Sequence, residues 1–139
     1  MSSKKKTWEE KFHTRIEPEI KRIDKAFADI PENGLMLIAT PKIIEDYVRQ
    51  IPKGTVVSIK QMRRDLAAEY GAEFTCPVTT GIFLRIVSEV NYERYLSTQD
   101  ASQVAPFWRA IEAKSSILKK LTFPVSFISE CQTHEASVS

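Results

Sequence analysis

The sequence has little of what several protein classes require. Among its 139 residues there are 2 cysteines and 2 histidines, and none of them has the spacing of a metal-ligand motif. Two cysteines far apart in an ordinary chain favour free thiols and a cytoplasmic protein over a secreted disulfide scaffold. No apolar run approaches the ~20 residues of a membrane-spanning helix, and none has the pattern of a signal peptide. We therefore expect no membrane association, no metal and no cofactor.

The chain also lacks a strong charge of either sign. Its 20 basic and 18 acidic residues leave a net charge of +2, so a nucleic-acid site would have to be a local basic patch. Hydrophobic residues make up 42% of the chain and charged residues 27%, as in an ordinary globular protein with its own core. Because there is no heptad pattern, we expect a monomer.

The chain is organised around residues 51–112, which open with a turn and a helix. Pro52 and Gly54 mark the turn. Ser58 and Gln61 form the S-x-x-Q pattern of a helix start, and Gly71 provides the stop. Apolar residues recur between them at helical spacing: Ile59, Met62, Leu66 and Tyr70.

A second helix is expected from Pro77 to Tyr95. The two sides of this helix differ in the residues that they carry. One side has the small residues Gly81 and Ser88 and a single long cation, Arg85. Such a face can approach a phosphate backbone closely. The other side is apolar, and we expect it to face the core: Val78, Ile82, Phe83, Ile86, Val87 and Val90.

Two short apolar runs follow, at residues 107–111 and 117–121. Both favour strands and a polar link separates them, so we expect a two-stranded hairpin. A helix, a turn, a second helix and a hairpin make a winged helix-turn-helix. The expected fold class is therefore mainly α with a small β wing. We divide the chain into an N-terminal helical extension with a short apolar strand (1–40) and a winged-helix domain (41–139).

Within that N-terminal extension, apolar residues recur at helical spacing from Trp8 to Ile30. They predict one amphipathic helix, or two short ones hinged at Pro18. Residues 35–39 are an apolar run too short for a helix, which favours a buried strand. Thr40, followed by Pro41, predicts the start of the next helix. That helix would support the turn at Pro52.

Three motifs in this order resemble the DNA-binding domain of alkylguanine-DNA alkyltransferases. IPKGTVVSIKQM is similar to the opening IP-x-G-x-T-V-S-Y-x-x-L of that domain, and RIVSEV to the R-A-V-x-x-A of its recognition helix. PFWRAI lies where the family has P-C-H-R-V-V. The resemblance covers roughly residues 41–130. It implies a small winged-helix domain of the alkyltransferase C-terminal type, whose recognition helix lies in the DNA minor groove. In that family the helix Arg replaces a flipped nucleotide, and the Cys takes the alkyl group.

The chain departs from the family at the residues that carry the chemistry. Phe107 stands at the acceptor Cys and Trp108 at the activating His, and neither side chain can be a nucleophile or a general base. Ile59 replaces the Tyr near the flipped nucleotide. The pattern is closer to the alkyltransferase-like proteins, which bind damaged DNA without repairing it. The resemblance thus implies a non-catalytic binder of double-stranded DNA that recognises alkylated or damaged bases, with a repair protein as a further partner and a place in the nucleoid.

Two alternatives stay open: a divergent methyltransferase that uses Cys76 as a displaced acceptor, and a protein-interaction domain that has lost DNA binding. The predicted DNA contacts are Thr80, Gly81, Arg85 and Ser88 of the second helix, Lys60, Arg63 and Arg64 of the first, and Arg109. The base-pocket candidates are Ile59, Phe107 and Trp108. Each set has a structural interpretation beside the functional one. The cations can form an ordinary solvated surface, and Phe107 and Trp108 can be core residues.

Overall fold

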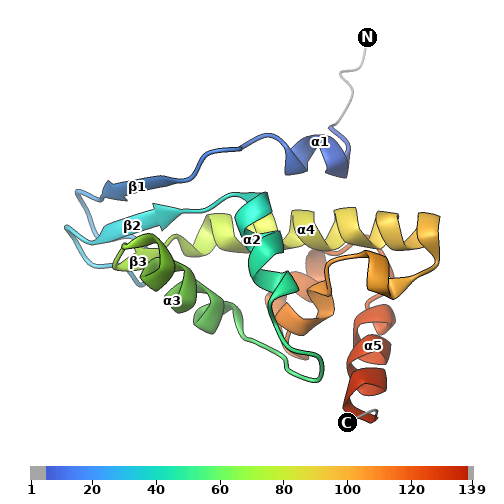
Figure 1. Ribbon diagram of the computed structural model, residues 1–139. Helices are drawn as coiled ribbons and strands as arrows, with labels where there is room; N and C mark the ends of the chain where they lie inside the picture. Colours follow the sequence, from blue (N-terminus) through green and yellow to red (C-terminus); the bar gives the residue numbers. More distant parts are fainter. Residues whose placement is uncertain (1–5, 138–139) are drawn as a thin grey trace.

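The computed structural model describes residues 6–137, and within them the fold is mainly helical with a small three-stranded sheet (Figure 1). The α-helices are α1 (Trp8–Phe12), α2 (Pro41–Arg49), α3 (Ile59–Tyr70), α4 (Pro77–Thr98) and α5 (Ser126–Ser137). The strands are β1 (Glu19–Arg22), β2 (Leu35–Ile38) and β3 (Phe74–Thr75). Three short 3-10 helices complete the fold: η1 (Ala101–Gln103), η2 (Phe107–Ala110) and η3 (Ser116–Lys120). No helix of this described part is long and apolar enough to cross a membrane.

The sheet is mixed, with β2 in the middle. β2 pairs antiparallel with β1, where Ile20 faces Leu37, and parallel with β3, where Met36 faces Phe74. The expected strand at 35–39 is confirmed, and its side chains from Met36 onward are buried. β2 belongs to the expected N-terminal extension, whereas β3 belongs to the expected winged-helix domain. The sheet therefore joins the two.

The helix starts predicted from capping residues are confirmed. The Thr40 hydroxyl accepts a hydrogen bond from the backbone N–H of Ile43, and Pro41 is the first residue of α2. The Ser58 hydroxyl caps α3 in the same way, and Gly71 ends that helix with a φ of 71°, in the left-handed region. The Gln61 side chain binds Asp65 at 2.7 Å rather than the cap, so only half of the expected capping box forms.

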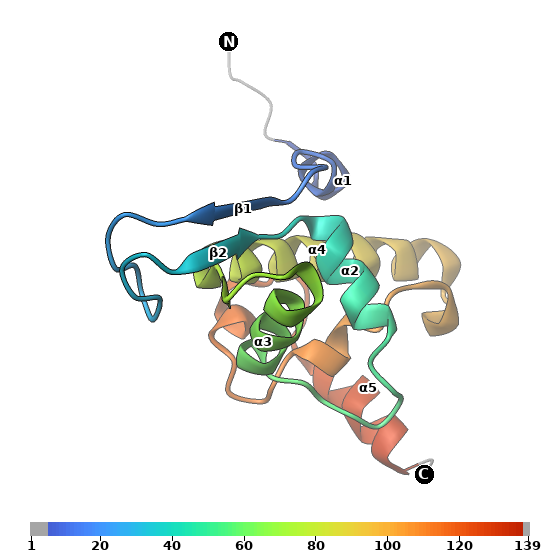
Figure 2. The same ribbon diagram turned by 60° about the vertical axis from the view of Figure 1, so that its left-hand side comes forward.

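α4 is the central helix of the core. In both ribbon views α1 lies above α4 and α5 below it, while α2 and α3 cover one side (Figures 1 and 2). One part of the core is aromatic: the rings of Phe107, Trp108, Phe123 and Phe127 pack against one another. Phe107 is completely buried and Trp108 is 4% exposed. The interpretation of these two residues as core is confirmed.

The sequence predicts one helix from Trp8 to Ile30, or two short ones hinged at Pro18; only its start forms a helix, and the helix after Pro18 is wrong. α1 ends at Phe12, and residues 19–22 form β1 instead. All four β1 residues are exposed, and their backbone groups pair with β2. The backbone N–H and C=O groups of residues 19–22 are therefore used by the sheet and not by a helix. The helical spacing of the apolar side chains does not reveal that the backbone can pair with β2 instead.

The predicted wing strands at 107–111 and 117–121 are also wrong, since both runs form 3-10 helices. The backbone of the first is satisfied locally: Phe107 N–H donates to Ala105 O and Arg109 N–H to Pro106 O. These short turns place Phe107, Trp108 and Ile117 in the core without a partner strand. The small sheet lies elsewhere, and within residues 6–137 no hairpin follows α4.

The turn before β2 leads to a stability prediction at Gly34. A Cβ atom added there would lie 2.8 Å from Ile30 Cγ2 and 3.0 Å from the Pro31 carbonyl oxygen. We expect Gly34→Ala to lower the free energy of unfolding by about 1–3 kcal/mol, because the neighbouring backbone cannot move away freely. Urea denaturation measures this change.

Gly81→Ala is the matched control. Nothing lies within 4 Å of a Cβ added at Gly81 in α4, and alanine favours a helix over glycine by about 1 kcal/mol. This variant should be as stable as the original chain or more stable. Equal losses in both variants would contradict the tight packing at Gly34.

Candidate functional site

The exposed side of α4 differs in part from the one expected: Ile86, Val87 and Val90 are buried as predicted, but other residues are reversed. Val78 and Ile82 are 53% and 50% exposed, whereas Thr80 and Ser88 are completely buried. The buried hydroxyls donate to carbonyl oxygens four residues earlier, Thr80 to Cys76 at 2.6 Å and Ser88 to Leu84 at 2.8 Å. Burial of a hydroxyl costs little when it is bonded in this way. The placement of Val78 and Ile82 inside and Ser88 outside is therefore wrong.

A cleft of about 610 Å³ runs along this exposed side of α4. It is formed by α1, the first residue of α3, the first turns of α4 and η3. Val78, Gly81, Ile82 and Arg85 of α4 line it, spaced so that they share one side of the helix. The other walls are mainly apolar: Trp8, Ile59, Pro77, Ile86 and Ile117.

The charges at the cleft are all positive. Lys11 of α1, Arg85 of α4 and Lys120 of η3 line it, and no carboxylate of the described residues does. These three cations come from segments far apart in the sequence, so only the fold brings them together. A chain with a net charge of +2 thus carries a local basic patch.

Trp8 connects two of these cations. The Arg85 guanidinium carbon lies 5.0 Å from the centre of the Trp8 ring, and the Lys11 ammonium nitrogen lies 4.3 Å from it. Both distances are within the range of cation–π interactions. The Nε atom of Arg85 is buried and has no hydrogen-bond partner in the described structure. Arg85 is also absent from the ion pairs of the described residues, so its positive charge at the cleft is not neutralised by a carboxylate.

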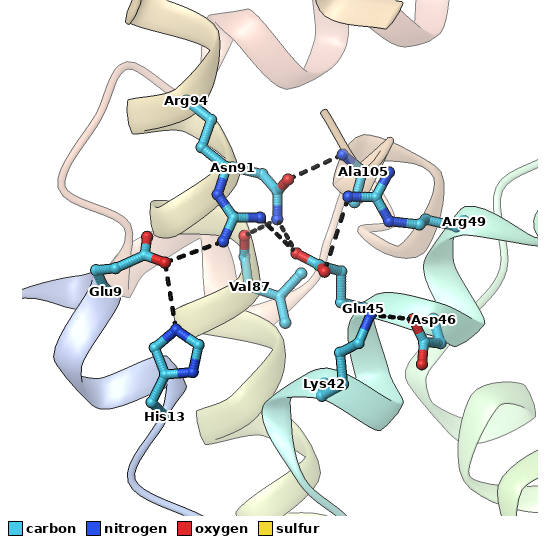
Figure 3. Close-up of polar contacts among 10 residues, drawn as sticks. All are labelled: Glu9, His13, Lys42, Glu45, Asp46, Arg49, Val87, Asn91, Arg94 and Ala105. Carbon is cyan, nitrogen blue, oxygen red and sulfur yellow. Dashed lines mark hydrogen bonds and ion pairs between the residues drawn. The ribbon is translucent and has the colours of Figure 1, made fainter. Parts of the chain in front are cut away.

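A polar network holds α1, and with it Trp8 and Lys11, against α4 (Figure 3). Arg94 of α4 donates to Glu9 of α1 at 3.1 Å and to Glu45 of α2 at 2.9 Å. Asn91, one turn earlier, donates to the same Glu45 carboxylate. Since the Glu45 side chain is only 5% exposed, its two donors replace the water that it loses on folding.

Of the residues predicted to contact DNA, Gly81 and Arg85 line the cleft, as does the base-pocket candidate Ile59. Sequence analysis missed Trp8, Lys11 and Lys120. The only sequence signal for Trp8 was its helical spacing with Phe12, which indicated a buried face rather than a site.

The three basic residues of α3 lie at a separate hollow of about 100 Å³. Arg63 is committed to the fold there: it makes two hydrogen bonds to Asp29, at 2.7 and 2.8 Å, and one to the Thr75 carbonyl oxygen. Its hydrogen bonds hold the pKa of Asp29 below the ordinary value. Lys60 and Arg64 remain exposed.

Arg109 is likewise part of the fold. Its guanidinium forms a two-pronged pair with Glu135 of α5, with a shortest distance of 2.7 Å, and donates to the Ile51 carbonyl oxygen. Burial raises the pKa of Glu135, but the hydrogen bonds and positive charge of Arg109, together with the Gly54 N–H and the neighbouring Trp108, outweigh it, so the pKa lies below its ordinary value. Phe107 and Trp108 do not line the cleft.

Neither cysteine has the surroundings of a reactive thiol. Cys76 is 5% exposed and packs with Ile30, Met36 and Ile38. Burial and the carboxylates of Glu135 and Glu130 raise the pKa of Cys131 to about 11, which disfavours its thiolate. Within residues 6–137, no three histidine, cysteine or acidic residues are grouped to hold a metal ion.

The chain matches no protein-family model, no curated protein and no solved structure. What the cleft binds is therefore inferred from its geometry and charge.

The pair of Arg109 and Glu135 predicts a pH-dependent loss of stability. Both side chains are mostly buried, so Arg109→Ala should cost about 3 kcal/mol of unfolding free energy by leaving a carboxylate unpaired. Because the pKa of Glu135 is lowered in the folded state, its contribution is present above the unfolded value of about 4.3 and disappears as the pH falls through the folded value.

Urea denaturation at pH 7 and at pH 3 measures both effects. The original chain should lose more stability between these pH values than Glu135→Gln does. Arg49→Ala is the control, because Arg49 is 43% exposed and lies 3.7 Å from Glu45, and it should cost less than about 1 kcal/mol. Equal costs for Arg109→Ala and Arg49→Ala would contradict a structural role for Arg109.

Proposed function

We propose that this chain is a non-catalytic, double-stranded DNA-binding protein of the alkyltransferase-like type. In this proposal α3 and α4 are the two helices of a helix-turn-helix, and the exposed side of α4 faces the minor groove. The observation that carries it is the cleft, where Lys11, Arg85 and Lys120 converge on that side of α4 without a carboxylate. Phosphate groups are the ligands that such a patch attracts most strongly.

Two features of the fold support this assignment. α3 and α4 are consecutive helices, joined by a short connection that contains the left-handed Gly71 and the two residues of β3. Such an arrangement is typical of helix-turn-helix proteins. On the outer side of α4, nothing lies within 4 Å of a Cβ added at Gly81, so a sugar-phosphate backbone can come close to the helix there.

The proposal assigns roles to the three cations of the cleft. Arg85 reaches into the groove, where Arg is the side chain most often used, while Lys11 and Lys120 contact phosphates on either side. Lys60 is exposed at the separate hollow of α3 and would contact DNA outside the cleft. Arg63 and Arg109 hold the fold through Asp29 and Glu135. The η2–η3 segment takes the place of a β wing.

The setting that we propose is the cytoplasm, where the two free thiols at Cys76 and Cys131 remain reduced. The chain would act there as a monomer on alkylated or damaged sites and would hand them to a repair protein, because it carries no Cys at the acceptor position of the family.

Fluorescence anisotropy with a short duplex, with and without one alkylated guanine, tests the proposal across a salt series. The protein should bind at low salt and lose affinity as salt rises. Arg85→Gln and Lys120→Gln should each weaken binding and reduce the log–log salt slope by about one. Tighter binding to the alkylated duplex would support recognition of the damaged base.

Lys42→Gln is the charge-matched control. Lys42 lies on α2, pairs with Asp46 and does not line the cleft. The Lys42→Gln substitution removes one positive charge, as the cleft variants do, and should leave DNA binding unchanged. No binding at low salt would contradict the proposal, and the exposed Val78 and Ile82 would then indicate a protein partner.

A further inference from the structure

The interior of the cleft differs from a surface that only follows a phosphate backbone. Its volume of about 610 Å³ lies within the ~300–1,000 Å³ range of small-molecule sites. Most of its walls are aliphatic or aromatic, and they come from four different elements. A duplex that lies across α4 would touch the rim, whereas the concave interior fits a compact apolar group.

Two residues of this interior remain largely exposed although they are apolar. Val78 and Ile82 are 53% and 50% exposed, and both line the cleft from the first turns of α4. Trp8 and Ile117 face the same space from α1 and η3. An apolar ligand body would remove these side chains from water, which is the main source of affinity in such sites.

The cations restrict the charge of the ligand. Lys11, Arg85 and Lys120 line the cleft with no carboxylate among the described residues to balance them. Arg85 belongs to no ion pair among the described residues, so no carboxylate balances its charge. An anionic head group would pair with the Arg85 guanidinium, whereas a cationic head group would be repelled.

We propose that the cleft binds a small organic anion, with an apolar body between Trp8, Ile82 and Ile117 and an anionic head group at Arg85 and Lys120. The shared chemistry is that of an alkyl carboxylate or an alkyl phosphate. Binding of this ligand goes beyond the proposed DNA binding and does not depend on it. The ligand and DNA would share Arg85, so the cleft offers a way for a metabolite to compete with DNA.

Decanoate is the probe, and isothermal titration calorimetry measures its binding below its micelle concentration. Decanoate should bind, whereas 1-decanol should bind at least tenfold more weakly and decyltrimethylammonium should not bind, because only the anion satisfies Arg85. Decyl phosphate identifies the preferred head group. Equal binding of the anion, the alcohol and the ammonium ion would overturn the proposal.

Variants separate the cleft from other apolar surfaces. Arg85→Gln and Lys120→Gln should each weaken decanoate binding by about tenfold. Ile82→Asp places a carboxylate in the cleft at a half-exposed position, and it should abolish binding. Lys119→Gln is the matched control, since Lys119 is the exposed neighbour that does not line the cleft. Unchanged affinity in the three cleft variants would overturn the proposal.

Intrinsic fluorescence gives a second measurement. The chain has 2 tryptophans; Trp8 lines the cleft, whereas Trp108 is 4% exposed in the core. Decanoate should change the emission of the original chain and not that of Trp8→Phe. If the protein binds decanoate but not DNA, the proposed anion site is supported and the proposed DNA binding is contradicted. DNA binding without decanoate binding would overturn the anion site alone.

Discussion

Asn91 of α4 is completely buried and joins three segments that are far apart in the sequence (Figure 3). Its amide nitrogen donates to Glu45 of α2 at 2.9 Å and to the Val87 carbonyl oxygen at 2.8 Å. Its amide oxygen accepts from the backbone N–H of Ala105, just before η2. Through Glu45 and Arg94 the same network reaches Glu9 on α1. The amide thus meets all of its buried partners only when this side of α4 faces inward.

The orientation of α4 decides where the site lies. Ile82 precedes Asn91 by nine residues, which at 3.6 residues per turn is about two and a half turns. With Asn91 inside, Ile82 must point outward, together with Val78 and Arg85. The hydroxyls of Thr80 and Ser88 accompany Asn91 into the core because each binds a carbonyl oxygen of its own helix. The exposed apolar residues of the cleft are therefore a consequence of satisfied polar groups in the core.

Two sets of basic residues differ in what their charges contact. Arg63, Arg94 and Arg109 each contact a carboxylate and connect segments of the fold. Arg85 instead lies over the ring of Trp8, and Lys11 and Lys120 line the cleft beside it. In the described part of the chain these three make no salt bridge. Their field is thus available to an anion, whether a phosphate of DNA or the head group of a small organic acid.

Local capping patterns correctly predict where α2 and α3 begin and where α3 ends. Thr40, Ser58 and Gly71 mark helix ends through bonds within three or four residues, so their pattern is readable without the fold. The sequence by itself also determined the mainly helical class and the strand at 35–39. Three features depend on tertiary contacts. Residues 19–22 form a strand, residues 107–110 form a 3-10 helix, and Trp8 and Lys120 line the same cleft as Arg85. Strand pairing, the rotation of α4 and the convergence of cations depend on contacts between residues distant in the chain, and local periodicity carries no record of those contacts.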